Sequence, residues 1–235
     1  MPEVVSAPAK LTRSLRVIGV RADGYHLIDA EMVSLDLADT ITFSDGDALE
    51  VHGSTGDVPA DDDNLVRQAL RAVGRTAHVV LDKRIPSGAG LGGGSADAAA
   101  VLRWAGSTDL DLAASLGADV PFCLVGGRAR VTGVGEEVTP LPFEPLTFTL
   151  LTPPVHCSTP AVYRAWDDLG GPTADGPNDL EPAALVVAPE LARYRDQLGN
   201  ATGRTPVLAG SGSTWFVDDA HAGDGFVVVH ATPSV

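Results

Sequence analysis

The sequence predicts an α+β protein built from two domains. Patterns typical of strands dominate the first fifty residues. A glycine-rich segment then separates an apolar strand pattern at 78–81 from an alanine-rich helical pattern. A second break in the sequence pattern occurs where the apolar run 146–151 is followed by Thr152-Pro153-Pro154. We therefore expect one domain over residues 1–145 and a second over residues 146–235.

The first domain is expected to begin with sheet. Apolar residues at alternating positions predict strands at 4–7, 15–20, 31–37, 40–43 and 49–52. Asp23-Gly24 is a turn signal, and Ala38-Asp39 is expected to break the sheet between two of the strands. A loop rich in glycine, proline and aspartate covers residues 54–63, and helical spacing of apolar residues predicts a helix over 64–73.

The least ordinary segment is the run from Ile85 to Ser95, which contains five of the 26 glycines within seven consecutive positions. Glycine reaches positive φ without steric cost, so such a loop can wrap an anion with its N–H groups. Ser95 is a good helix N-cap, Asp97 would lie in the first turn, and the alanines that follow favour helix. A glycine loop that opens into a helix N-terminus predicts a phosphate site.

Other interpretations of this run fit less well. Residues 88–93 match the dinucleotide pattern G-x-G-x-x-G, but that fingerprint normally follows the first strand of its domain and here arrives after more than eighty residues. No lysine follows Gly93, which excludes a Walker A loop. A mobile glycine hinge remains as the structural alternative.

The rest of the chain alternates between the two kinds of element. Helical patterns cover residues 109–116, 159–166 and 191–198, and a further helix is entered at 178–181 and interrupted by Pro182 and Pro189. Strand patterns cover 128–134, 146–151, 207–208, 215–217 and 226–230. A second loop of small residues, 209–214, separates two of these strands, and a hairpin connection would explain it equally well.

Charge and composition exclude several classes of protein. The chain carries 31 acidic and 16 basic residues, a formal net charge of −15, which opposes nonspecific binding to nucleic acid or anionic membranes. The two cysteines, Cys123 and Cys157, are too few for a disulfide framework, and no metal-ligand spacing is present. Without a signal peptide or an apolar run of spanning length, we expect a soluble cytoplasmic protein, a monomer or weak homodimer.

Four side chains stand out as candidates for chemistry. Lys10 is one of only two lysines, although a lone lysine is usually a solvated surface group. Asp119 lies among apolar neighbours, where a carboxylate can accept a proton, and the alternative is an aspartate that caps a helix or a turn. Tyr25 and His26 could fill a core, or they could stack on and hydrogen-bond to a flat ring.

Several motifs together resemble those of the GHMP kinase superfamily, and most closely its 4-diphosphocytidyl-2-C-methyl-D-erythritol kinases. The three superfamily motifs correspond to Pro8-Ala9-Lys10-Leu11, the loop Pro86 to Ser95 and Gly210-Ser211-Gly212. The segments that resemble this particular family are Arg21 to His26, Asp63 to Val66, Gly88 to Ser95, Gly117 to Phe122 and Pro177 to Glu181. The resemblance covers nearly the whole chain.

The resemblance implies a fold and a reaction. The N-terminal domain would be like domain 2 of ribosomal protein S5, the C-terminal domain would be ferredoxin-like, and the active site would lie in the cleft between them. ATP would phosphorylate the C2 hydroxyl of a methylerythritol that carries a cytidine diphosphate, a step of non-mevalonate isoprenoid biosynthesis. Mg²⁺ would be carried on the phosphates, with no metal site of the protein's own.

The resemblance also assigns roles to residues. Asp119 and Lys10 match the catalytic aspartate and its partner lysine. Tyr25 and His26 match the site that recognises cytosine, and Tyr163 would be the second stacking ring. Substrate binding extends to Thr159, Gly210 and Ser211. The residues implied in ATP binding are Asn64, Lys83, Pro86, Ser87, Gly88, Ala89, Gly90, Leu91, Gly92, Gly93, Gly94, Ser95 and Ala96.

The chain departs from the family pattern at a few places. Thr12 stands where the family usually has asparagine, Ala209 stands where serine or threonine is usual, and the C-terminal domain is shortened. Two alternatives therefore stay open: another small-molecule kinase of the superfamily, such as one for homoserine or mevalonate, or a nucleotide-binding pseudokinase that performs no transfer.

Overall fold

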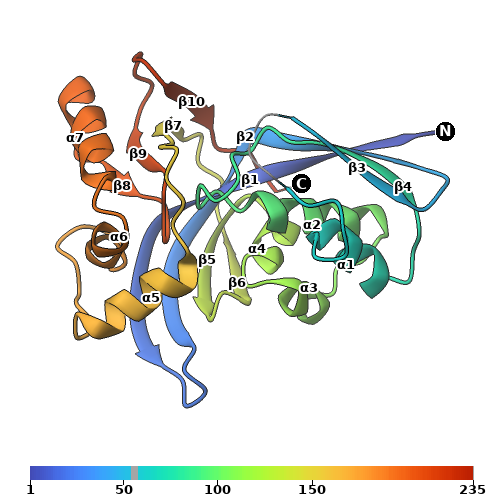
Figure 1. Cartoon of the computed structure of the whole chain (residues 1–235), viewed down its shortest axis with the longest axis horizontal. Coiled ribbons are helices and arrows are strands. Elements are labelled where there is room, and N and C mark those ends of the chain that lie inside the picture. The colour runs from blue at the N-terminus through green and yellow to red at the C-terminus, as the bar shows by residue number, and fades with distance from the viewer. Residues whose placement is uncertain (54–57, 235) are drawn as a thin grey trace.

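A computed structural model describes residues 1–53 and 58–234. The predicted loop at 54–63 thus lies partly outside the described residues. The architecture is α+β, with a larger sheet formed by residues 3–141 and a smaller one formed by residues 147–230 (Figure 1). Among the described residues, no helix combines the length and the apolar character needed to cross a membrane.

The larger sheet has six strands, arranged in the order β3-β4-β2-β5-β6 with β1 on the other side of β2. Their bounds are β1 Glu3–Val20, β2 His26–Ser44, β3 Ala48–His52, β4 His78–Asp82, β5 Arg128–Gly133 and β6 Glu137–Leu141. One end of β2 pairs with β4 and its other end with β5, while β1 pairs along nearly its whole length. Strand β2 therefore organises the sheet.

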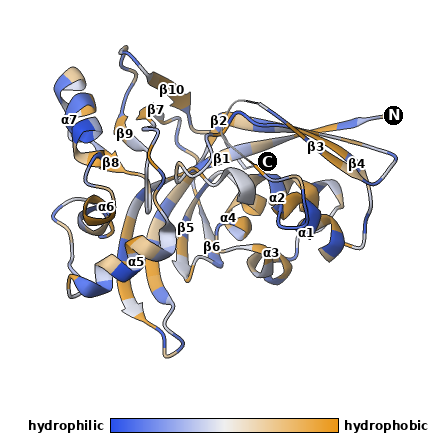
Figure 2. Cartoon of the chain, viewed as in Figure 1, coloured by the Kyte–Doolittle hydropathy of each residue, from blue (hydrophilic) through white to orange (hydrophobic). Residues whose placement is uncertain are grey.

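Strands β1 and β2 correct two predictions. Residues 4–7 and 15–20 belong to one 18-residue strand, and 31–37 and 40–43 belong to one 19-residue strand with no break at Ala38-Asp39. Pro8 is tolerated because β1 pairs in the sheet with β2 alone and its register shifts between Pro8 and Lys10. Figure 2 shows hydrophobic and hydrophilic residues in turn along parts of both strands, as expected for a partly exposed sheet. The middle of each strand is buried on both faces, over residues 9–12 of β1 and 32–35 of β2.

Four helices pack together beside the larger sheet (Figure 1). They are α1 Leu65–Ala72, α2 Gly93–Trp104, α3 Leu110–Leu116 and α4 Val120–Val125. Helix α2 is the central one, since it contacts α1, α3, α4, β1 and β2, and every residue from Ala96 to Leu102 is buried. Small alanine side chains allow this close approach on all sides.

The smaller sheet has the strand order β10-β7-β9-β8, with every pair antiparallel. Its strands are β7 Thr147–Leu151, β8 Val207–Leu208, β9 Trp215–Asp218 and β10 Phe226–His230, and helices α5 Thr159–Asp168, α6 Glu181–Val187 and α7 Leu191–Thr202 lie between β7 and β8. This order is the one expected for a ferredoxin-like domain. The connection 219–225, however, joins β9 to β10 without a helix.

The larger sheet is joined to the connection between α5 and α6 by contacts between segments far apart in the sequence. The backbone of Leu15 in β1 exchanges hydrogen bonds with Pro177 and Asp179. The Asp179 carboxylate also accepts hydrogen bonds from Val17 N–H at 3.0 Å and from the Arg16 guanidinium at 2.7 Å. The predicted boundary at 145/146 falls between β6 and β7, and the division of the chain there stays a prediction.

Candidate active site

Lys10 occupies the middle of β1, beside its register shift. Its side chain is only 7% exposed, so the expectation of a solvated lysine does not hold. Nζ lies 3.2 Å from Asp119 Oδ2 and donates a hydrogen bond of 3.1 Å to Thr12 Oγ1. The Lys10 backbone N–H donates to the carbonyl oxygen of Leu91, which ties this strand to the glycine loop.

Asp119 precedes the first turn of α4 and occupies its N-cap position. Its carboxylate makes no hydrogen bond to the helix backbone, so capping does not account for it. The side chain is one-third exposed. A carboxylate that is paired with an ammonium and still open to a cavity can accept a proton from a bound hydroxyl group.

The glycine loop is held in place by close backbone contacts. Gly90 and Gly92 have φ of +77° and +69°, in the left-handed region where glycine is favoured. A Cβ on Gly90 would lie 2.7 Å from the carbonyl oxygens of Ala209 and Gly212. The loop 209–214 is therefore more than a hairpin connection between β8 and β9, because it lies directly against the glycine loop.

The start of α2 differs from the prediction. The helix begins at Gly93, with Gly92 as a left-handed N-cap that has no side chain to bond the free N–H groups. Ser95 is thus the third helical residue and not the cap, and Asp97 lies beyond the first turn, where it is buried. An N-terminus without a side-chain cap leaves backbone donors available to an anion.

Two cavities adjoin these residues. The glycine-loop cavity, of about 320 Å³, is lined by the whole of Ile85 to Ser95 together with Val58, Pro59, Asp63, Asn64, Leu65, Lys83 and Asp97. The hairpin cavity, of about 610 Å³, is lined by Lys10 and Asp119, by Gly24, Tyr25 and His26 at the β1–β2 turn, and by residues of α5 and the loop 209–214. Ser95 lines both cavities, so they meet at the start of α2.

Two lining residues of the glycine-loop cavity, Lys83 and Asp97, belong to a buried cluster of three charged side chains that Asp39 completes. The ammonium of Lys83 pairs with Asp39 and, at 2.7 Å, with Asp97. Asp39 also accepts hydrogen bonds from the backbone N–H groups of Arg84 and Ile85, at 2.5 and 2.8 Å. This cluster, which we call the Lys83 triad, connects β2, the entry to the glycine loop and α2.

Burial has an electrostatic consequence in the Lys83 triad. Desolvation raises the pKa of Asp97 to about 7, although the nearby Lys83 ammonium acts in the opposite direction. Its Oδ1 has no hydrogen-bond partner among the described residues. The Lys83 ammonium is paired with two carboxylates, so its contact with ATP stays a prediction. The contact of Asn64 with ATP also stays a prediction, because its side chain caps α1 and donates a hydrogen bond to the carbonyl oxygen of Pro59.

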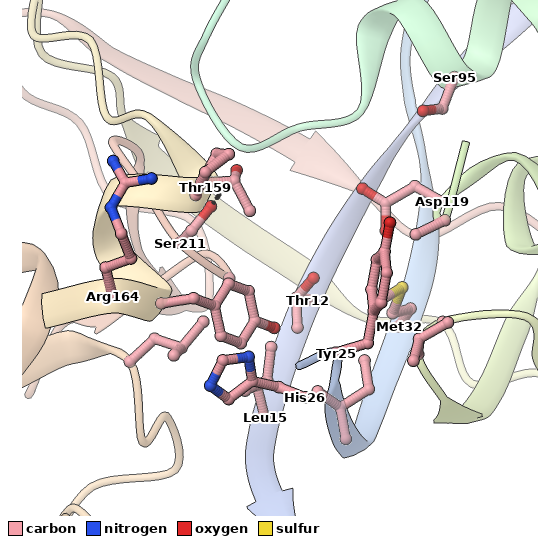
Figure 3. Close-up of a pocket in the computed structure, with 18 of the residues that line it drawn as sticks. Thr12, Leu15, Tyr25, His26, Met32, Ser95, Asp119, Thr159, Arg164 and Ser211 are labelled. Atoms are coloured by element: carbon pink, nitrogen blue, oxygen red, sulfur yellow. Dashed lines mark hydrogen bonds between the residues drawn. The ribbon is translucent and has the colours of Figure 1, made fainter. Parts of the chain in front are cut away.

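The wall of the hairpin cavity brings together the predicted recognition residues (Figure 3). The rings of His26 and Tyr163 lie with their centroids 4.6 Å apart. Tyr25 is 61% exposed at the hairpin turn, where the guanidinium of Arg21 lies over its ring. Burial, with a smaller contribution from Asp119, raises the pKa of Tyr163 above its usual range, so its hydroxyl remains a hydrogen-bond donor.

The start of α5 and the loop 209–214 also line this cavity. Thr159 and Ser211 are hydrogen-bonded to each other through their hydroxyl groups at 2.8 Å. Gly210 lies close to Lys10 and Thr12, since a Cβ there would be 3.7 Å from the Lys10 ammonium. All the predicted substrate-binding residues thus line one cavity with the Lys10–Asp119 pair.

Comparison with known proteins decides the family. Residues 64–127 match the GHMP kinases N terminal domain family. The chain is 40% identical to a 4-diphosphocytidyl-2-C-methyl-D-erythritol kinase of Paracoccus denitrificans (strain Pd 1222) over 90% of this chain and 85% of that protein, and 39% identical to one of Ruegeria pomeroyi, over 89% and 86%. This chain belongs to the 4-diphosphocytidyl-2-C-methyl-D-erythritol kinase family.

Solved structures agree with this membership. A crystal structure of a 4-(cytidine 5'-diphospho)-2C-methyl-D-erythritol kinase superposes with a TM-score of 0.78 at 32% identity, covering 99% of this chain and 100% of that one. A homoserine kinase from Cytophaga hutchinsonii superposes with a TM-score of 0.61 at 19% identity, covering 98% and 95%, which shows a shared fold alone. The predicted GHMP kinase fold is thus confirmed.

Several residues at the site of this family member have roles that no local sequence pattern indicates. Arg164 and Asp167 of α5 line the hairpin cavity, and Asp39 completes the Lys83 triad. Asn178 lies in a segment that resembles the family, but the sequence does not show what its side chain does. Its amide donates hydrogen bonds to the carbonyl oxygens of Leu208 and Gly210 and so holds the loop that faces Lys10. Helical spacing would have placed Tyr163 and Asp167 on one face of α5.

Proposed function

We propose that this chain transfers the γ-phosphoryl group of ATP to the C2 hydroxyl of 4-diphosphocytidyl-2-C-methyl-D-erythritol, a step of non-mevalonate isoprenoid precursor biosynthesis. The observation that carries the proposal is the position of the Lys10–Asp119 pair, which lines the hairpin cavity where that cavity meets the glycine-loop cavity at Ser95. A donor in one cavity and an acceptor in the other would meet at this pair.

The roles of the residues follow from their chemistry. The phosphates of ATP would be bound by the backbone N–H groups that follow Pro86 in the glycine loop and by the uncapped start of α2. Asp119 would accept the proton of the acceptor hydroxyl, and the Lys10 ammonium would stabilise the negative charge that develops on that oxygen. Ala96 and the backbone near Asn64 and Lys83 would complete the nucleotide site.

The acceptor would be bound by the remaining wall of the hairpin cavity. Tyr25, His26 and Tyr163 would hold the cytosine, while Thr159, Gly210 and Ser211 would face the rest of the molecule. Arg164 brings a second positive charge to the cavity, besides Lys10, for the diphosphate. We take the protein to work in the cytoplasm, as a monomer or weak homodimer without a nucleic-acid or membrane partner.

Mg²⁺ fits the donor set around the junction of the two cavities. A hydroxyl oxygen is a ligand that this ion accepts, and Ser95 provides one there, beside the phosphates of ATP that would carry the ion. When bound, the ion would neutralise charge on the transferring group. Among residues 1–53 and 58–234, no cluster of three or more histidine, cysteine, aspartate or glutamate side chains is arranged to bind a metal.

A substrate panel tests the proposal directly. ADP release from Mg-ATP is measured with the cytidyl acceptor, with homoserine and with mevalonate, and we expect turnover with the cytidyl acceptor alone. Turnover of homoserine or mevalonate would reassign the chain within the superfamily. Binding of ATP without transfer to any of the three alcohols would instead identify a pseudokinase.

A further inference from the structure

We propose that Asp167 is a positioning residue that sets the preference of the hairpin cavity for cytosine over uracil, by holding the proton of His26 on Nε2. This inference rests on the proposed function, because it concerns the base of the proposed acceptor. It assigns a role to a side chain in the last turn of α5 that lies outside every motif of the sequence.

The first step is the hydrogen bond between the two side chains. His26 Nε2 lies 2.8 Å from Asp167 Oδ1, and the imidazole is only 10% exposed. A carboxylate oxygen accepts hydrogen bonds and cannot donate one, so Nε2 must carry the proton. In the neutral ring the other nitrogen, Nδ1, then presents a lone pair.

The second step is the fixed position of the ring. The Tyr163 ring lies 4.6 Å from it at 33°, and Trp166 meets it edge-on at 5.5 Å. Tyr163, Trp166 and Asp167 belong to the same helix, so one rigid element sets both the orientation and the tautomer of His26. In the described part of the chain no group hydrogen-bonds to Nδ1. His26 lines the hairpin cavity (Figure 3), and Asp167 is also part of its lining.

The third step is the chemistry of the base. Cytosine offers a hydrogen through its 4-amino group, whereas uracil has a carbonyl oxygen at the same position. A lone pair at Nδ1 can accept from the amine but repels the carbonyl oxygen. Leaving a buried acceptor without a partner also costs free energy, so the same atom favours one base and disfavours the other.

The test measures base preference without requiring turnover. Cytidine 5'-diphosphate and uridine 5'-diphosphate are titrated calorimetrically into the full chain, in the wild type and in Asp167→Ala, Asp167→Asn and Asp168→Asn. Asp168 is the matched control, because it is the neighbouring exposed aspartate of α5. Long-range ¹H–¹⁵N NMR correlations of the His26 ring report directly which nitrogen carries the proton.

We expect the wild type to bind the cytidine nucleotide about tenfold more tightly than the uridine nucleotide, with the His26 proton on Nε2. Asp167→Ala should reduce this preference to within about twofold and give a mixture of tautomers. Asp167→Asn should keep part of the preference because an amide oxygen can still accept from Nε2, and Asp168→Asn should behave as wild type. In turnover assays, Asp167→Ala should raise the KM for the acceptor and leave kcat and the KM for ATP unchanged.

Other results would overturn the inference. A wild type that binds both nucleotides equally, a His26 proton found on Nδ1, or an Asp167→Ala variant that retains the full preference would each exclude the role of Asp167. Its failure is separable from that of the proposed function. A chain that selects the cytidine nucleotide through Asp167 but phosphorylates no acceptor would refute the proposed reaction alone.

Discussion

The glycine-loop cavity and the hairpin cavity meet at Ser95, yet they are built from different parts of the polypeptide. Backbone groups and small residues of one continuous segment form most of the first, over the buried Lys83 triad. Side chains from the β1–β2 turn, α5 and the loop 209–214 form the second. A phosphate is the same in every nucleotide and can be bound by backbone N–H groups, whereas an individual acceptor needs individual side chains.

The largest effect is expected where the two cavities meet. Asp119→Asn should lower kcat by about 10³-fold, because the amide cannot accept the proton that the carboxylate takes. Binding of ATP should be nearly unchanged, since the glycine loop does not depend on this side chain. Steady-state kinetics and calorimetry with ATP measure the two quantities.

A control separates this effect from general damage. Asp111→Asn changes an exposed aspartate of the neighbouring helix α3 and should retain wild-type kcat. If the Asp119→Asn enzyme kept kcat within about tenfold of wild type, the carboxylate would not be the proton acceptor of the reaction.

The backbone character of the glycine-loop cavity can be tested with Gly90→Ala. The new Cβ would meet two carbonyl oxygens at 2.7 Å, so the loop must move away from residues 209–212. We expect a loss of about 3 kcal/mol of unfolding free energy and a higher KM for ATP. Denaturant unfolding and kinetics provide the measurements.

Gly106→Ala is the matched control for this substitution. Gly106 has nearly the same φ, +75°, but a Cβ there would meet nothing within 4 Å. It should therefore cost only the backbone strain of about 1 kcal/mol. Equal losses in the two variants would show that the contact between the two loops is unimportant.

The Lys83 triad gives a prediction for pH. The pKa of Asp97, about 7 in the folded protein, exceeds the ordinary value of 3.8 for an aspartate, so the folded state binds an additional proton between these two pH values. The contribution of this group to stability should therefore be greatest below pH 4 and should fall as the pH rises to about 7. Asp97→Asn should remove this dependence and raise the unfolding free energy at pH 8 by on the order of 2 kcal/mol.

Unfolding free energies of both proteins at several values between pH 5 and pH 8 test the effect of Asp97. The difference between variant and wild type should grow with pH and level off above about pH 7. A difference that is constant over this range would mean that Asp97 is already ionised throughout.

The smallest effect is expected in the contact between Lys10 and Thr12. Thr12→Val keeps the shape of a fully buried side chain but removes the oxygen that accepts from the ammonium. A lost hydrogen bond of this kind costs about 1 kcal/mol, so kcat should fall about fivefold. Thr12→Ser retains the hydroxyl and should be close to wild type, and a Thr12→Val enzyme with unchanged kcat would show that Lys10 needs no such support.

The comparison of the two cavities also explains what the sequence could predict. The sequence predicts a phosphate site at the glycine loop because the residues that form it are consecutive. The resemblance to the family assigns Lys10 and Asp119 to one catalytic pair. The contact between His26 and Asp167 spans 141 residues and follows no motif, so only the fold brings it together. Pairing between distant segments is set by tertiary structure, which local patterns do not contain.

The errors in the predicted elements have specific physical causes. Asp39 looked like a strand breaker, but its carboxylate is satisfied by Lys83 and by the N–H groups of Arg84 and Ile85, so strand β2 continues through it. Ser95 looked like a cap, but left-handed Gly92 starts the helix earlier and leaves the N–H groups free. The departures from local rules thus lie at the proposed nucleotide site, where a functional constraint can outweigh propensity.

The backbone hydrogen bond from Lys10 to Leu91 has a consequence for redesign. It ties the strand that carries the lysine to the phosphate-binding loop, so the position of this transfer group is fixed from the donor side of the site. Helix α5 and the hairpin turn can then be altered as an exchangeable module. A new acceptor could be accommodated by substitutions at residues 24–26, 163, 164 and 167, with the transfer apparatus kept as it stands.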